Sequence, residues 1–169
     1  MTPEEISPRL ATPQDEPFLR QLFYTVRAPE FQAAGMSPEQ LETFLAQQYH
    51  AMRTYYAQAY PETEYQILEH RGTAIGYEAL QTTHELHLID IALVPEYRNQ
   101  GIGTNRMRRL QSRATDVGKS LVLSVEVFNP AKRLYERLGF SVIEESEIYQ
   151  HMGWNLGKAE TTAERQWLV

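Results

Sequence analysis

The chain has 169 residues, a formal net charge of −6 at pH 7 and no cysteine. This length suits one compact domain with a sizeable core. The missing cysteines exclude disulfides, thiolate nucleophiles and Cys-ligated zinc, and they fit a cytoplasmic protein. The acidic balance argues against a nucleic-acid partner. No apolar run approaches the roughly 20 residues of a membrane span, so we expect no membrane partner.

The first part of the chain predicts one strand and two helices. A short strand over residues 5–11 contains Pro8, which cannot donate to a strand ladder and so favours an edge position. A helix with apolar residues at helical spacing follows to about Arg27. A loop over residues 29–36 connects it to a second helix, which opens with a serine cap and a proline and runs toward Tyr60.

The second part of the chain predicts strands and helices in alternation. In chain order we expect strands 65–69, 74–80 and 85–94, a helix over 101–117, a strand over 121–127, a helix over 130–138 and a hairpin of strands 141–147 and 148–154. No linker or internal repeat interrupts this pattern. We therefore expect a single domain over residues 5–154 and a C-terminal tail over residues 155–169.

The turn between strand 85–94 and the following helix carries the sequence from Arg98 to Thr104, RNQGIGT. The first N–H groups of a helix have no intrahelical partner, and the peptide dipoles place partial positive charge at that end. Glycines let a backbone approach an anion closely, and Arg98 can add charge-assisted hydrogen bonds. The turn therefore predicts a pyrophosphate site, although its spacing matches neither the dinucleotide-binding nor the P-loop fingerprint.

Two motifs in the same order resemble those of the GNAT acetyltransferase superfamily. Arg98-x-x-Gly101-x-Gly103 after a strand resembles the acetyl-CoA signature R/Q-x-x-G-x-G/A. The segment Asn129 to Phe140 resembles N-x-x-A-x-x-L-Y-x-x-x-G-F, although it is one residue shorter between its asparagine and its alanine. The resemblance covers Ile6 to Trp154. It implies a mixed α/β fold, an α+β arrangement: a mostly antiparallel twisted sheet with a parallel splayed pair at the CoA site, flanked by four helices.

The resemblance implies an N-acetyltransferase that moves an acetyl group from acetyl-CoA directly to a primary amine on a small molecule or a peptide. With no cysteine, an acetyl-cysteine intermediate is excluded. Many members of the family carry a glutamate that acts as the general base at the position of Ile89, which cannot take up a proton. The alternative function is therefore a CoA-binding sensor or interaction module without catalysis. A second alternative is a protein that binds a different phosphate-containing ligand, such as a nucleotide. A homodimer through the last hairpin would be compatible with activity.

By resemblance, the pyrophosphate of the co-substrate would lie on the turn and its pantetheine arm along the end of strand 85–94. A backbone N–H near Leu93 is the expected donor to the thioester carbonyl. The expected CoA-binding residues are Ile91, Ala92, Leu93, Arg98, Asn99, Gln100, Gly101, Ile102, Gly103, Thr104, Asn129 and Lys132.

The resemblance to the L-Y-x-x-x-G-F segment implies that Tyr135 is the proton donor to the departing thiolate. The chemistry suits a phenol, since the reference pKa of tyrosine, about 10, lies above that of a thiol, about 8.5. The general base is open. His87 is the first candidate because histidine suits base work near neutral pH. Asp90 should point to the opposite face of its strand unless a bulge intervenes, and Glu126 or ordered water are further options. No metal is expected. The resemblance implies an acceptor pocket to which Phe31, Met36, Ile89 and Tyr149 contribute.

Overall fold

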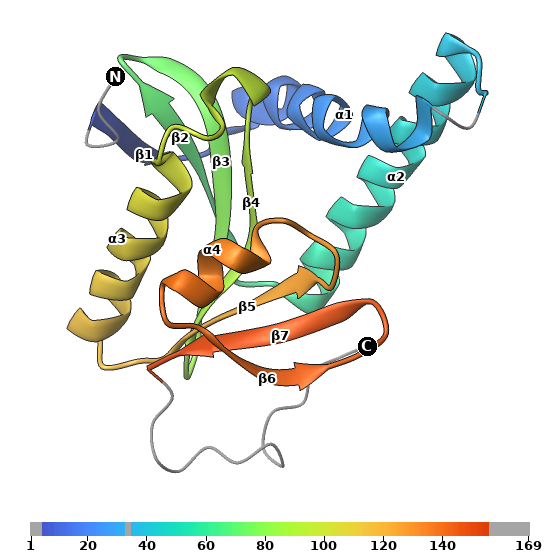
Figure 1. Ribbon diagram of the computed structural model, residues 1–169. Helices are drawn as coiled ribbons and strands as arrows, with labels where there is room; N and C mark the ends of the chain where they lie inside the picture. The colour runs from blue at the N-terminus through green and yellow to red at the C-terminus, as the bar shows by residue number, and fades with distance from the viewer. Residues whose placement is uncertain (1–4, 33–34, 156–169) are drawn as a thin grey trace. The chain divides into compact units, whose positions relative to one another are not determined.

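The computed structural model describes residues 5–32 and 35–155. Its elements (Figure 1) are β1 (Ile6–Leu10), the 3-10 helix η2 (Pro13–Asp15), α1 (Glu16–Gln32), α2 (Pro38–Ala59), β2 (Glu64–His70), β3 (Thr73–Thr82), β4 (Leu86–Leu93), the 3-10 helix η3 (Pro95–Tyr97), α3 (Ile102–Asp116), β5 (Leu121–Glu126), α4 (Lys132–Arg137), β6 (Ser141–Glu145) and β7 (Tyr149–Trp154). All but the first residue of the predicted tail lies outside the described residues.

The strands form one seven-stranded sheet in the order β1-β2-β3-β4-β5-β7-β6. β4 and β5 run parallel, with Leu86 to Leu88 opposite Leu121 to Leu123. The pairs β1–β2, β5–β7 and β6–β7 are antiparallel. The predicted mixed sheet with a parallel pair is therefore confirmed, and so is the predicted order of strands and α-helices within the described part of the chain.

The chain divides into two compact units, which we call unit 1 and unit 2. Unit 1 comprises residues 1–79 and 90–100, and unit 2 comprises residues 80–89 and 101–169. Strands β3 and β4 each contribute residues to both units. The single domain over residues 5–154 stays a prediction, and each unit is described by itself below.

In unit 1, α1 and α2 pack against each other, for example through the rings of Phe23 and Tyr49, whose centroids lie 5.4 Å apart. Leu22 of α1 and Leu45 of α2 are buried, at 2% and 3% exposed. The start of α2 is fixed by a reciprocal cap. The Ser37 hydroxyl accepts the N–H of Gln40 at 3.3 Å, and Gln40 Oε1 accepts the N–H of Ser37 at 2.9 Å. The predicted start of this helix is confirmed.

The predicted loop over residues 29–36 is wrong at its beginning, because α1 continues through Pro29 to Gln32. A proline inside a helix removes one hydrogen bond and crowds the preceding turn. Phe31 packs edge-on against Phe44 of α2, with ring centroids 4.8 Å apart. This aromatic contact stabilises the turn after the proline. Local sequence could not reveal it, because the partner ring belongs to the other helix.

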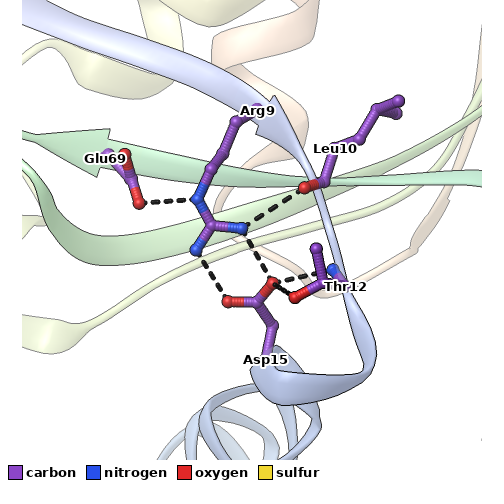
Figure 2. Close-up of polar contacts among 5 residues, drawn as sticks. All are labelled: Arg9, Leu10, Thr12, Asp15 and Glu69. Carbon is purple, nitrogen blue, oxygen red and sulfur yellow. Dashed lines mark hydrogen bonds and ion pairs between the residues drawn. The ribbon is translucent and has the colours of Figure 1, made fainter.

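Arg9 of β1 joins the first strand to its neighbour and to the start of the helical region (Figure 2). Its Nη1 and Nη2 donate to the two carboxylate oxygens of Asp15 at 2.8 and 2.7 Å, and its Nε donates to Glu69 at 2.7 Å. Asp15 also accepts the N–H and the hydroxyl of Thr12, at 2.8 and 2.9 Å. The Arg9 guanidinium and these caps hold the pKa of Asp15 well below its usual range.

Replacing Asp15 by asparagine is expected to lower the free energy of unfolding by about 1.5 kcal/mol at neutral pH, because the amide keeps one acceptor oxygen but loses the charge and the second acceptor that bind Arg9. The estimate stays modest because the Arg9 side chain is 40% exposed and solvent screens the pair. Folding lowers the pKa of Asp15, so this stability is complete above the unfolded-state pKa and is lost as the pH falls toward the folded-state pKa.

Urea unfolding of both proteins, at neutral pH and below about pH 4, checks this expectation. The difference between wild type and Asp15→Asn should shrink in acid. Asp116→Asn, at an exposed position at the end of α3, is the matched control and should behave as wild type throughout. A difference that stays constant with pH would contradict the assigned role of the carboxylate.

In unit 2, α3 contacts β5, and one face of the helix carries a stripe of buried apolar side chains. Met107, Leu110 and Ala114 lie three and four residues apart on one helix face and are at most 2% exposed. Gln111 Nε2 donates to the carbonyl of Leu138 at 2.8 Å, which ties α3 to the end of α4. β6 and β7 form the predicted hairpin beside β5 (Figure 1).

Candidate functional site

The predicted phosphate turn follows η3 and ends in α3. Asn99 and Gly101 adopt left-handed backbone conformations, with φ of 59° and 78°. Gly101 is the N-cap of α3, and no side chain caps the helix there. Glycine suits this position because other residues are strained at such a φ. The first-turn N–H groups of α3 are therefore not covered by a capping side chain and can donate to an anion.

Arg98 is anchored at the end of β4. Its Nε donates to the carbonyl of Leu93 at 2.9 Å, and the side chain belongs to an exposed residue. A guanidinium has five N–H donors, and this bond uses only the one on Nε. The two terminal nitrogens can therefore donate hydrogen bonds to a phosphate. The arrangement fits the predicted role of Arg98.

The last residues of β4 present backbone groups on the side away from β3. The Val94 N–H donates to the carbonyl of Ile75 at 2.9 Å, which pairs these two residues across the strands. Antiparallel alternation then turns the backbone groups of Ala92 toward β3 and those of Ile91 and Leu93 away from it. An extended ligand could pair with these outward groups as an added strand does.

Asp90 is held by two uncharged donors. The Tyr77 hydroxyl donates to Oδ2, and the N–H of Ile91 donates to Oδ1 at 2.8 Å. Asp90 therefore shares a face of the β3–β4 pair with Tyr77. Burial raises the pKa of Asp90 despite these hydrogen bonds. Burial and then the neighbouring Asp90 charge raise the pKa of Tyr77 well above its usual value. Sequence reasoning missed this Tyr77 contact, which depends on the register between the strands.

His87 lies in unit 2, opposite Val122 of β5, and is 8% exposed. Burial lowers its pKa to about 4, and the nearby His151 and His84 act in the same direction. The imidazole is therefore neutral at neutral pH and can accept a proton. It is a weak base, however, because its conjugate acid loses the proton so readily.

Tyr135 lies in α4 and is 6% exposed, with its ring packed against Phe140 at a centroid distance of 5.8 Å. α4 is shorter than predicted and spans only Lys132–Arg137. Asn129 explains the shift, because its side-chain oxygen accepts the N–H of Ala131 at 2.9 Å and forms a turn before the helix. Lys132 Nζ lies 4.0 Å from Glu136.

The four predicted acceptor-pocket residues fall into two pairs. Phe31 and Met36 belong to unit 1, where Phe31 packs on α2 and Met36 is 38% exposed. Ile89 and Tyr149 belong to unit 2, where Tyr149 is 45% exposed in β7. Their common role in one pocket stays a prediction.

Within residues 5–32 and 35–155, no three histidine or acidic side chains gather as metal ligands would. In the same residues, no helix is both long and apolar enough to cross a membrane.

Comparison with known structures finds the same fold in several proteins. The PaiA N-acetyltransferase of Thermoplasma acidophilum, solved in complex with coenzyme A, is 19% identical, with a TM-score of 0.66 over 88% of this chain and 97% of that one. An acetyltransferase of Thermus thermophilus is also 19% identical, with a TM-score of 0.64 over 92% and 98%. YncA of Salmonella typhimurium, solved with its cofactor acetyl-CoA, is 17% identical, with a TM-score of 0.56 over 92% and 96%.

No curated protein sequence matches this chain significantly. A family model described as an acetyltransferase (GNAT) domain matches residues 32–157, which is most of the chain. That match includes both sequence motifs, the predicted phosphate turn and the parallel strand pair. The chain therefore belongs to the GNAT family of acyl-CoA N-acetyltransferases.

Proposed function

We propose that this protein binds acetyl-CoA and transfers the acetyl group directly to a primary amine. The observation that carries the proposal is the turn before α3, where left-handed Gly101 opens a 15-residue helix without a side-chain cap. Such an end favours phosphate. Arg98, fixed at the strand end by its bond to Leu93, adds a cation beside the turn in the sequence. The bound co-substrate would supply an activated acetyl thioester.

Different parts of the chain would hold different parts of the co-substrate. The turn from Arg98 to Thr104 would bind the phosphates, and the outward backbone groups of Ile91 to Leu93 would pair with the pantetheine amides. Asn129 and Lys132 would contribute further polar contacts. Because the Ile91 N–H already donates to Asp90, the N–H of Leu93 is the better donor to the thioester carbonyl.

Two side chains are proposed to handle protons at the transfer. Tyr135 would protonate the departing thiolate, a role that rests on its place in the L-Y-x-x-x-G-F motif. His87 would accept a proton as a neutral imidazole, although its lowered pKa limits its strength as a base. Direct transfer is supported by the absence of any cysteine that could carry the acetyl group.

The acceptor is proposed to be a small-molecule or peptide amine in the cytoplasm. The net charge of −6 favours a cationic acceptor. We further propose a homodimer through the β6–β7 hairpin, where Val142 and Ile148 are 44% and 63% exposed.

A thermal-shift titration with acetyl-CoA, CoA, ATP and NAD, followed by a thiol-release assay with primary amines, tests the proposal. A ligand at a hundred times its dissociation constant raises the stability of the folded state by roughly 2.7 kcal/mol. We expect stabilisation by acetyl-CoA and CoA alone and amine-dependent release of thiol. Binding without turnover would favour the sensor alternative. A response to another nucleotide, or to none, would contradict the placement of the phosphate site.

A further inference from the structure

Unit 2 presents a row of polar side chains on one face of its sheet. Ser124 of β5 lies opposite His151 of β7, and His151 lies opposite Glu144 of β6. Residues that pair across strands point to the same face of a sheet. The three side chains therefore form a line across three neighbouring strands, in the order hydroxyl, imidazole and carboxylate. Ser124 and Glu144 are exposed, and His151 is half-buried.

An irregularity in β6 brings the carboxylate into this row. Val142 pairs with Met152. The next pair joins Glu144 to His151, so Ile143 is an extra residue between the two pairs. An extra residue shifts the alternation of a strand by one position. Without this bulge, Ile143 would stand opposite His151 in place of the carboxylate.

The hydroxyl and the imidazole of the row are within hydrogen-bond reach, because Ser124 Oγ lies 2.7 Å from His151 Nδ1. A neutral imidazole with its proton on Nε2 accepts the hydroxyl proton at Nδ1. Burial lowers the pKa of His151, so its imidazole is neutral at neutral pH, whereas the Glu144 charge acts in the opposite direction and favours the imidazolium. An imidazole between a hydroxyl and a carboxylate is the arrangement by which hydrolases activate a serine.

The row faces away from the end of α4. Trp154 is three residues from His151 in β7 and so points to the opposite face of the sheet. Its ring lies beside the turn after α4, where a Cβ added to Gly139 would be 3.6 Å from Trp154 Cδ1. The parallel pairing of β5 with β4 ends at Leu123, directly before Ser124. The Ser124 side chain is therefore open to solvent at the point where this pairing ends.

We propose that Ser124 is a nucleophile, activated by His151 and supported by Glu144, which takes the acyl group from an acyl ester and passes it to water. The substrate class is a short acyl group on a good leaving group, as in an oxygen ester or a thioester. This activity goes beyond the acetylation of amines. It does not rest on the proposed function, because the three side chains belong to unit 2 and an oxygen ester needs no CoA site.

The reaction has two halves. The Ser124 oxygen forms a bond to the acyl carbonyl carbon and gives its proton to His151. The bond from that carbon to the leaving group breaks, and the leaving group takes the proton. Water then attacks the acyl-serine and gives a proton to His151, and the bond between the carbonyl carbon and the serine oxygen breaks as that oxygen recovers the proton. One ester and one water give one carboxylic acid and one alcohol or thiol.

The probe for this site is p-nitrophenyl acetate, an oxygen ester with a coloured leaving group. With the wild type we expect a burst of p-nitrophenolate equal in amount to the protein, and a single acetyl group on Ser124 in peptides from an acid-quenched sample. Urea-unfolded protein controls for non-specific acetylation and should give no burst. Acetyl-CoA without an amine is the second arm. If it releases thiol in the wild type but not in Ser124→Ala, the site takes thioesters as well as oxygen esters, and if it releases none, oxygen esters alone.

Three variants separate a catalytic row from a structural one. Ser124→Ala should lose the burst and the acetylated peptide. In His151→Asn the amide oxygen can still accept the hydroxyl hydrogen bond but cannot take the proton, so the burst should slow by about a hundredfold or more. Glu144→Gln should slow it less, because solvent screens an exposed charge. Ser141→Ala, at an exposed serine of β6 on the same face, is the matched control and should behave as wild type.

Three results would overturn the proposal. They are the absence of a burst in the wild type, an equal burst in Ser124→Ala, and an acetyl group on another residue of the folded protein in place of Ser124. A wild-type rate in His151→Asn would also overturn it, since the hydrogen bond would then be structural alone. Should Ser124→Ala fail to fold, His151→Asn and the site of acetylation in the wild type decide.

Discussion

Gly101→Val is expected to abolish the binding of acetyl-CoA and CoA. The new side chain would stand at the N-cap of α3, where the proposed pyrophosphate must approach the helix amides without obstruction. Valine at a φ of 78° is also strained, so the unliganded variant should lose about 1–3 kcal/mol of stability. Thermal-shift titration with acetyl-CoA, against a stability curve without ligand, measures both effects.

Gly118→Val is the matched control for backbone strain. Gly118 also has a positive φ, 66°, and an added Cβ there meets no atom within 4 Å. It lies just past the other end of α3, so it should show a similar loss of stability with normal CoA binding. Equal CoA affinity in Gly101→Val and Gly118→Val would mean that the phosphate site lies elsewhere.

Gly76→Ala is expected to destabilise the protein by about 3 kcal/mol, at the upper end of overpacking effects. An added Cβ at Gly76 would collide with the backbone carbonyl of Ala92 and come within 2.7 Å of Leu93 Cδ2. Backbone cannot move aside as a side-chain tip can. β4 would have to shift at the residues proposed to pair with pantetheine, so acetyl-CoA affinity should fall as well.

Chemical denaturation and calorimetric binding measure the two effects of Gly76→Ala. Gly103→Ala serves as control, because its new Cβ would lie 3.4 Å from Leu134 Cδ2, an ordinary contact, and alanine favours a helix. That variant should be as stable as wild type or more so. A stable Gly76→Ala protein with normal affinity would show that β3 and β4 are not held as closely as described.

Much of the fold could be predicted because its signals are local. The serine cap and proline at the start of α2, and the apolar spacing of α3, each act within a few residues. The end of α1 is an exception, because Pro29 is a strong local signal for the end of a helix. The helix nevertheless continues to Gln32, where Phe31 packs against Phe44 of α2. A pattern in one segment cannot report a contact made by another.

The candidate site also has features that the local sequence could predict and features that it could not. The turn before α3 could be predicted because its glycines and its arginine lie within a few residues of one another, and its role in binding phosphate stays a prediction. The surroundings of Asp90 could not, because the partnership with Tyr77 depends on strand register. The lowered pKa of His87, about 4, could not be predicted either, since only the folded chain supplies the burial that causes it.

The interleaving of the two units along the chain has a consequence for how the protein forms. Unit 1 needs residues 90–100, which are made only after residues 80–89 of unit 2. During synthesis, the described residues before Leu80 therefore emerge before residues 90–100, with which they share unit 1. Neither unit can be obtained by cutting the chain once, and each joins segments that are distant in the sequence, which is the kind of contact that slows folding. Fragments that end before residue 100 are accordingly poor starting points for dissecting this enzyme.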